Sequence, residues 1–271
     1  MRISTALGRN QNAVSLVILL VYAGLALVVY TYLTPPEFTA AGAAAIPILG
    51  GLPGDLPVYA LRFLMTAVMF GLIPLGLMRL PGLRLSDAGL VSPRGFLRTR
   101  LFAVLLVGAV VVGLLSSYSP ELAAYYPYSH TLLHLALQKS VLYFILHLTL
   151  YFVLYYIPWE ILFRGIMILP FLRMVENAAG PDRGKSDSSL QAILIVVASF
   201  QIIPSAMSHF GHPFNEMASA VLFGVLAGWL VVRTRSIIPG LLIHAAVGMT
   251  LDTALLLRAA GILPGGTLPG T

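Results

Sequence analysis

The sequence contains no cysteine and few charged residues, and each shortage removes classes of protein from consideration. The absence of cysteine excludes disulfide bonds, cysteine-ligated zinc and thiol nucleophiles. Charged residues make up only 10% of the chain, whereas a soluble domain has roughly 25%. No serine lies in a nucleophile elbow, and no glycine-rich phosphate-binding loop is present. Serine hydrolases with such an elbow and nucleotide-binding proteins with such a loop are therefore excluded.

Apolar residues are what the chain has in abundance. They make up 58% of its 271 residues, and the mean hydropathy is +0.91. No soluble core could enclose this much apolar surface, so lipid must be the solvent. A crossing helix takes about 20 mostly apolar residues. The sequence therefore predicts an all-α, polytopic transmembrane bundle of about seven spans: Asn12–Leu33, Val58–Met78, Leu101–Tyr118, Val141–Leu172, Leu190–Met207, Met217–Val232 and Ile237–Leu257.

The distribution of lysine and arginine predicts the orientation. If seven spans alternate, most of the 16 basic residues fall on one side. They are Arg2, Arg9, Arg79, Arg84, Arg94, Arg98, Arg100, Arg173, Arg183, Lys185, Arg233 and Arg235. The positive-inside rule then places the N-terminus in the cytoplasm and the C-terminus outside. The net charge of +6 is thus a topology signal, and the expected partner is the lipid bilayer and not a nucleic acid.

The positions of the spans divide the chain into three parts. Residues 1–140 hold three spans with their loops, residues 141–260 hold four spans, and residues 261–271 form a flexible tail rich in glycine and proline. The fourth span is longer than one crossing needs and has Pro158 near its middle. A kinked or tilted helix is expected there.

The fourth span also carries ionisable residues, which cost roughly 2.5–3.5 kcal/mol each at the bilayer centre. Glu160 and Arg164 are four residues apart, so they lie on one helix face. One interpretation is an ion pair that only makes insertion tolerable. The other is a buried carboxylate that takes a proton from water. His147, among leucine, phenylalanine and tyrosine, is expected to serve packing.

Two further spans contribute polar groups. His209 and His212 lie at the outer end of the fifth span, followed by Glu216. His244 and Asp252 lie two turns apart in the seventh, roughly on one face. Interfacial or structural histidines are the plain alternative. Together with the fourth span, these groups could hold a water molecule in a membrane-embedded pocket, which suggests hydrolysis.

These residues resemble the motifs of the CPBP family, the CAAX proteases and bacteriocin-processing enzymes, which are glutamic-type intramembrane endopeptidases. The family has two consecutive glutamates with an arginine four residues after the second one. A phenylalanine four residues before a histidine follows, and then a histidine four residues before an asparagine or aspartate. The matching positions here are Trp159, Glu160, Arg164 and Gly165, then Ser205 and His209, then His244 and Gly248. The resemblance covers about Val141 to Leu255 and implies a catalytic core in residues 141–260.

The resemblance implies a role for each matching residue. Glu160 activates water with help from His209, because Trp159 replaces the first glutamate of the pair. Arg164 orients Glu160, and His244 stabilises the oxyanion. Asp252, one turn beyond Gly248, substitutes for the family's asparagine or aspartate, and Trp159, His212 and Glu216 are expected binding residues.

A bacterial subgroup near the myxosortases is also similar to this chain. It has a Trp-Glu pair, then histidine, glycine, proline and glutamate spaced as in His209–Glu216, and then the turn Arg233–Ile237. This similarity implies a prokaryotic multi-pass protein of the inner (plasma) membrane. It also implies processing of C-terminal sorting signals.

The sequence therefore predicts an intramembrane endopeptidase that cuts near the C-terminus or in a membrane-proximal segment of its substrate. The expected partner is a membrane-associated protein or lipidated peptide, and no cofactor is expected. One alternative is a zinc enzyme with Glu160, His209 and His244 as ligands. A second is an inactive scaffold or immunity protein of the same fold, motivated by Trp159 and Gly248. A third is a transporter with Glu160 as a proton relay.

Overall fold

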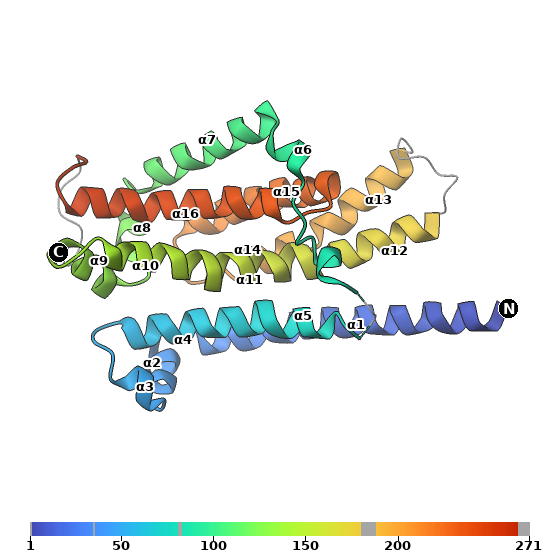
Figure 1. Cartoon of the computed structure of the whole chain (residues 1–271), viewed down its shortest axis with the longest axis horizontal. Coiled ribbons are helices and arrows are strands. Elements are labelled where there is room, and N and C mark those ends of the chain that lie inside the picture. Colours follow the sequence, from blue (N-terminus) through green and yellow to red (C-terminus); the bar gives the residue numbers. More distant parts are fainter. Residues whose placement is uncertain (1, 35, 81–82, 180–187, 265–271) are drawn as a thin grey trace.

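The computed structural model describes residues 2–34, 36–80, 83–179 and 188–264, and within these ranges the chain forms helices and no strand (Figure 1). The elements are α1 (Arg2–Leu33), α2 (Pro36–Ala44), α3 (Pro47–Gly50), α4 (Leu56–Thr66), η1 (Ala67–Leu72), α5 (Ile73–Leu77), η2 (Leu85–Ala88), α6 (Arg94–Leu97), α7 (Arg100–Ser116), α8 (Pro120–Tyr125), α9 (His130–Gln138), α10 (Leu142–Tyr151), η3 (Phe152–Tyr156), α11 (Ile157–Glu160), η4 (Ile161–Ile166), α12 (Leu169–Ala179), α13 (Ser188–Ser199), α14 (Ile202–Met207), α15 (Phe214–Thr234) and α16 (Ile238–Ala259). The predicted polytopic helical bundle is confirmed.

Within the part of the chain that the structure describes, six helical segments are long and apolar enough to cross a membrane. They are Leu16–Leu33, Leu56–Leu77, Leu142–Asn177, Ser188–Met207, Phe214–Thr234 and Ile238–Ala259. The third expected span is realised as α7, which has 17 residues and is therefore shorter than a usual crossing. Its Gly113 lies against the backbone carbonyl of Val247 in α16, so a side chain there would collide with that helix.

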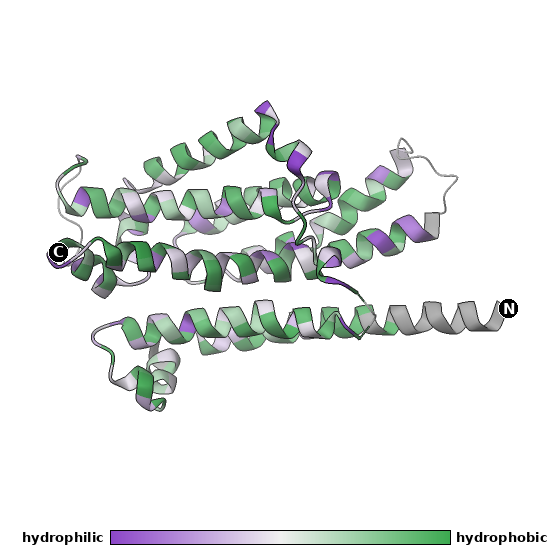
Figure 2. Cartoon of the chain, in the orientation of Figure 1, coloured by the Kyte–Doolittle hydropathy of each residue, from purple (hydrophilic) through white to green (hydrophobic). Residues whose placement is uncertain are grey.

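Apolar side chains cover the outside of the bundle, as a lipid solvent requires. Figure 2 shows α7 and the middle of α1 largely in the colour of hydrophobic residues. Val17, Val21 and Leu25 of α1 and Val104 and Val107 of α7 are each more than half exposed. Such surface would be costly in water and favourable in hydrocarbon.

The fourth spanning segment, Leu142–Asn177, is the centre of the bundle. In an apolar 18-residue stretch of this segment 72% is buried, whereas the corresponding stretches of the other five segments are 28–50% buried. Around Pro158 the segment contains two π-helical stretches, η3 and η4, on either side of α11, and the kinked or tilted helix expected there stays a prediction. Proline removes a backbone donor from a helix, and π-helical turns are frequent at functional sites.

The hydrophobic core joins the two halves of the chain. One cluster unites Ala26 of α1 and Phe63 of α4 with Tyr155, Trp159 and Leu241. The predicted boundary at residue 140 therefore crosses a shared core, and the division of roles between the halves stays a prediction.

The start of α1 and the end of α16 lie at opposite ends of the bundle (Figure 1). At the end where α1 starts, ion pairs join Arg173 to Asp87 and Arg235 to Glu176. The predicted cytoplasmic location of this end stays a prediction. Arg183, Lys185 and most of the expected tail, residues 265–271, lie outside the described residues.

Candidate active site

The first polar cluster is centred on Glu160, in the most enclosed helix. The carboxylate is fully buried, and Arg164 is 1% exposed. Glu160 Oε1 accepts a hydrogen bond from Arg164 Nη1 at 3.2 Å and one from His244 Nδ1 at 2.8 Å. The predicted pairing of Glu160 with Arg164 on one face is confirmed, and α16 brings His244 to the same carboxylate.

Glycine follows Arg164 in this cluster for a packing reason. A Cβ at Gly165 would lie 2.8 Å from the carbonyl oxygen of Ala88, the last residue of η2. Only glycine lets η2 approach η4 this closely. The arginine–glycine pair of the motif thus combines an ion-pair partner with a close contact.

The second polar cluster is formed by the loop between α14 and α15. Gly211 has a φ of +92°, which favours glycine and turns the chain between His209 and His212. Pro213 then precedes α15 and places Glu216 in its first turn. Glu216 Oε1 accepts from His212 Nδ1 at 2.9 Å and from the Tyr126 hydroxyl at 2.7 Å.

His209 faces Glu216 from the other side. Its Nδ1 lies 2.7 Å from the Ser205 carbonyl oxygen, which can only accept, so Nδ1 carries the proton. Its Nε2 is then an unprotonated acceptor, 3.9 Å from Glu216 Oε1. Two acceptors interact only through a donor, and water is a molecule that can donate to both.

Burial sets the protonation state of His209. The side chain lies beyond the end of the fifth spanning segment and is enclosed by protein. Desolvation lowers the pKa of His209 from 6.5 to about 4, although the charge of Glu216 opposes this shift. His209 is therefore neutral at physiological pH and available as an acceptor.

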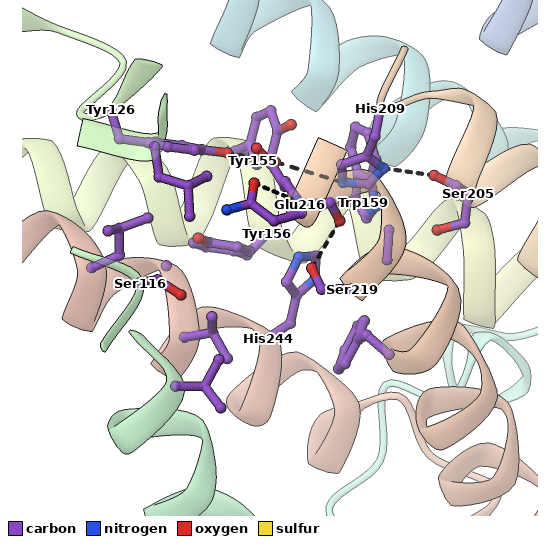
Figure 3. A pocket seen from close by; sticks show the side chains of 18 of the residues that line it. Ser116, Tyr126, Tyr155, Tyr156, Trp159, Ser205, His209, Glu216, Ser219 and His244 are labelled. Atoms are coloured by element: carbon purple, nitrogen blue, oxygen red, sulfur yellow. Dashed lines mark hydrogen bonds and ion pairs between the residues drawn. The ribbon is translucent and has the colours of Figure 1, made fainter. Parts of the chain in front are cut away.

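Both clusters border one cavity of about 190 Å³. Figure 3 shows Glu216 and His209 on one side of it, His244 on another and Trp159 between them. Arg164 also lines the cavity, whereas Glu160 is not among the lining residues. Glu160 thus lies behind His244 and Arg164, and the carboxylate that faces the cavity is Glu216.

Trp159 occupies the neighbourhood of His209. The two rings meet edge to face with centroids 5.7 Å apart, and Trp159 is 2% exposed. Its other face stacks on Tyr155 at 5.2 Å. The position of a glutamate in the resembling family is therefore occupied here by an aromatic side chain that lines the cavity. The carboxylate near His209 comes instead from Glu216, on a different helix.

A tyrosine fills the space beside Gly248. A Cβ at this glycine would overlap the hydroxyl of Tyr156. The Tyr156 ring also meets His244 edge to face, with centroids 4.9 Å apart. Tyr156 thus brings a hydroxyl to the place where the resembling family has an asparagine or aspartate side chain.

The structure gives Asp252 a different neighbour from the one expected. Its Oδ2 accepts from His147 Nε2 at 2.8 Å, and Asp252 is not among the residues that line the cavity. His147 Nδ1 forms a hydrogen bond with the Tyr59 hydroxyl, 3.0 Å away. The expectation that His147 only packs is therefore wrong, because both ring nitrogens are bonded. A buried aspartate needs a partner, but the sequence could not name one 105 residues away.

The zinc alternative requires Glu160, His209 and His244 to converge. Glu160 and His244 are in contact, but His209 lies in the other cluster, against Glu216. Across the described ranges, no three histidine, aspartate or glutamate side chains gather as a metal would need.

Comparison with known proteins is informative for the central part of the chain. Residues 140–250 match the family model described as type II CAAX prenyl endopeptidase Rce1-like. The match covers less than half of the chain, and it includes Glu160, Arg164, His209, Glu216 and His244. A search of the curated proteins and of the solved structures finds no match. This polytopic helical chain is thus similar, across both polar clusters, to a family of membrane endopeptidases.

Proposed function

We propose that this protein is an intramembrane endopeptidase that hydrolyses a peptide bond of a membrane-held substrate. The observation that carries the proposal is that two histidine–carboxylate clusters border one cavity in an otherwise apolar bundle. Ionisable groups in a membrane protein are costly and mark functional sites. The family match over residues 140–250 supports the endopeptidase class.

Glu216 and His209 activate the water. A water molecule between His209 Nε2 and Glu216 Oε1 donates to both, so its oxygen lone pair is free to attack a peptide carbonyl. Glu216 takes the proton that the water loses and later delivers it to the leaving amide nitrogen. In the resembling family the first glutamate of the Glu-Glu pair supplies this carboxylate. Trp159 stands at that position here, and Glu216 supplies the carboxylate instead.

His244 and Tyr156 stabilise the oxyanion. Glu160 accepts from His244 Nδ1 and orients the ring at the cavity, and a His244 ring that carries both protons can donate its Nε2–H to the developing charge. The Tyr156 hydroxyl is the second donor, in the space left by Gly248. Arg164 compensates the charge of Glu160. Glu160 is thus a positioning residue, although the resemblance alone assigned it the water.

The substrate is a membrane-associated protein or a lipidated peptide, cut near its C-terminus or in a membrane-proximal segment. The variant motif shared with the subgroup near the myxosortases supports a sorting tail on a surface protein. A prenylated C-terminal peptide or a bacteriocin leader would present a similar apolar segment. No metal takes part: water activation by Glu216 and His209 needs none.

The test measures cleavage in membranes from cells with and without the gene, by comparing the termini of surface and secreted proteins. Wild type and Glu121→Gln, an exposed carboxylate outside the cavity, should produce the same new termini. Glu216→Gln and His209→Asn should produce none while inserting normally. A wild-type chain that cuts nothing would support the inactive scaffold instead. Activity that a chelator removes and zinc restores would support the zinc enzyme.

A further inference from the structure

A second cavity, of about 520 Å³, lies beside the first. Tyr155 borders both cavities, and the loop that places His209 at the first places His212 at the second. The second cavity is lined by α4 and by a set of tyrosines that includes Tyr30, Tyr125 and Tyr128. A peptide that crosses the first cavity therefore has an adjoining space for one of its ends.

The second cavity contains a cation without an ion-pair partner. Arg62 Nη2 donates to the Thr34 carbonyl at 3.0 Å, and the guanidinium lies over the Tyr128 ring, 5.4 Å from its centroid. Its Nε is buried and has no hydrogen-bond partner, and no carboxylate of the described residues pairs with it. An enclosed guanidinium in this state favours an anionic ligand, and its planar fork suits a carboxylate.

The carboxylate of Asp55 also lines this cavity, but its oxygens already accept hydrogen bonds from other groups. Asp55 accepts from Ser129 Oγ at 2.8 Å and from the backbone N–H groups of His130 at 2.7 Å and Thr131 at 3.3 Å. These donors and the positive end of α9 compensate its charge. Asp55 therefore orders the wall of the cavity without neutralising Arg62.

We propose that Arg62 binds the free C-terminal carboxylate of the peptide whose bond is cut in the first cavity. This inference rests on the proposed function. Carboxylate binding at Arg62 fixes the chain end, and Tyr155 borders both the cavity that holds this end and the cavity that Glu216 lines. The protein thus selects substrates by their free C-terminus and cuts at a set distance from it.

Binding and cleavage are measured separately on the full chain in detergent micelles. The probes are a dye-labelled pool of short apolar peptides with a free C-terminus and the same pool as C-terminal amides. Wild type should bind the acid pool about tenfold more tightly than the amide pool, a difference typical of a charge-assisted hydrogen bond. Arg62→Gln should bind both pools as wild type binds the amides. The matched control Arg258→Gln, which also removes an arginine lying over a tyrosine ring, should keep the preference.

Each outcome separates this inference from the proposed function. An Arg62-dependent acid preference without any cleavage would keep the carboxylate site and contradict the endopeptidase. Cleavage of acids and amides at equal rates, with equal affinities, would overturn the carboxylate site alone. An acid preference that survives in Arg62→Gln would also overturn it. Equal peptide affinities together with Arg62-dependent retention of phosphatidylglycerol would assign the site to a lipid phosphate instead.

Discussion

The two carboxylates of the site, Glu160 and Glu216, have opposite surroundings. Glu160 is sealed in the central helix, bonded to Arg164 and His244, and absent from the cavity wall. Glu216 lies in the first turn of α15, lines the cavity, and has its side chain 15% exposed. A sealed carboxylate with a guanidinium partner holds other groups in place. A carboxylate at a cavity can exchange a proton with water. The location of each carboxylate, and not its place in a sequence motif, therefore indicates which of the two could activate water.

Replacement of Glu216 should have the largest effect on catalysis. Glu216→Gln keeps the shape and an acceptor for Tyr126 but cannot take a proton. We expect kcat to fall about 10²–10⁴-fold, the usual range for loss of a general base, while the melting temperature stays near that of wild type. Cleavage assays and thermal unfolding of the same preparation check this. Full activity in Glu216→Gln would return the water-activating role to Glu160.

Replacement of Glu160 should act first on stability. Glu160→Gln leaves Arg164 buried and charged without its ion-pair partner, which costs about 3–5 kcal/mol in the free energy of unfolding. Replacing both residues by leucine should restore most of that stability, because a buried pair exchanged for apolar side chains is often neutral. Activity should stay lost in both variants, since His244 loses its partner. Wild-type stability in Glu160→Gln would contradict the buried ion pair, and wild-type activity in this variant would contradict the positioning role.

Tyr156 tests the opposite wall of the cavity. Tyr156→Phe removes only the hydroxyl next to Gly248 and His244. Loss of one oxyanion donor lowers kcat by about 10²-fold, with KM unchanged because the donor acts in the transition state. Single-turnover kinetics on one cleaved peptide would measure this. An effect on KM alone would instead make Tyr156 a substrate-binding residue.

The pH dependence tests the neutral state of His209. Because burial lowers the pKa of His209 to about 4, the acid limb of kcat/KM should lie near pH 4 and not near 6.5. The unfolded chain takes up a proton at His209 near pH 6.5, so the free energy of unfolding should also fall as the pH drops from 6.5 toward 4. His209→Asn should remove this part of the dependence. An acid limb near pH 6.5 would contradict the neutral, buried state.

Sequence patterns located what is local and missed what depends on long-range packing. The lengths of the apolar runs and the four-residue spacing of Glu160 and Arg164 gave the spans and the first ion pair. The pairing of Asp252 with His147 joins distant helices, so no local pattern reports it. No local pattern reports the proximity of Glu216 to His209 either, because it depends on the turn at Gly211. The third predicted span runs to Tyr118, whereas α7 ends at Ser116.

Asp252 offers the smallest expected effect on activity and completes the comparison with a third buried carboxylate. It bonds His147 and lies off the cavity wall, so Asp252→Asn should leave kcat unchanged. His147 Nε2 would lose a charged acceptor, and the free energy of unfolding should fall by about 1–3 kcal/mol. Thermal unfolding and cleavage of the same peptide measure the two quantities. A loss of activity without a loss of stability would place Asp252 beside His244 in the reaction, as the motif resemblance implied.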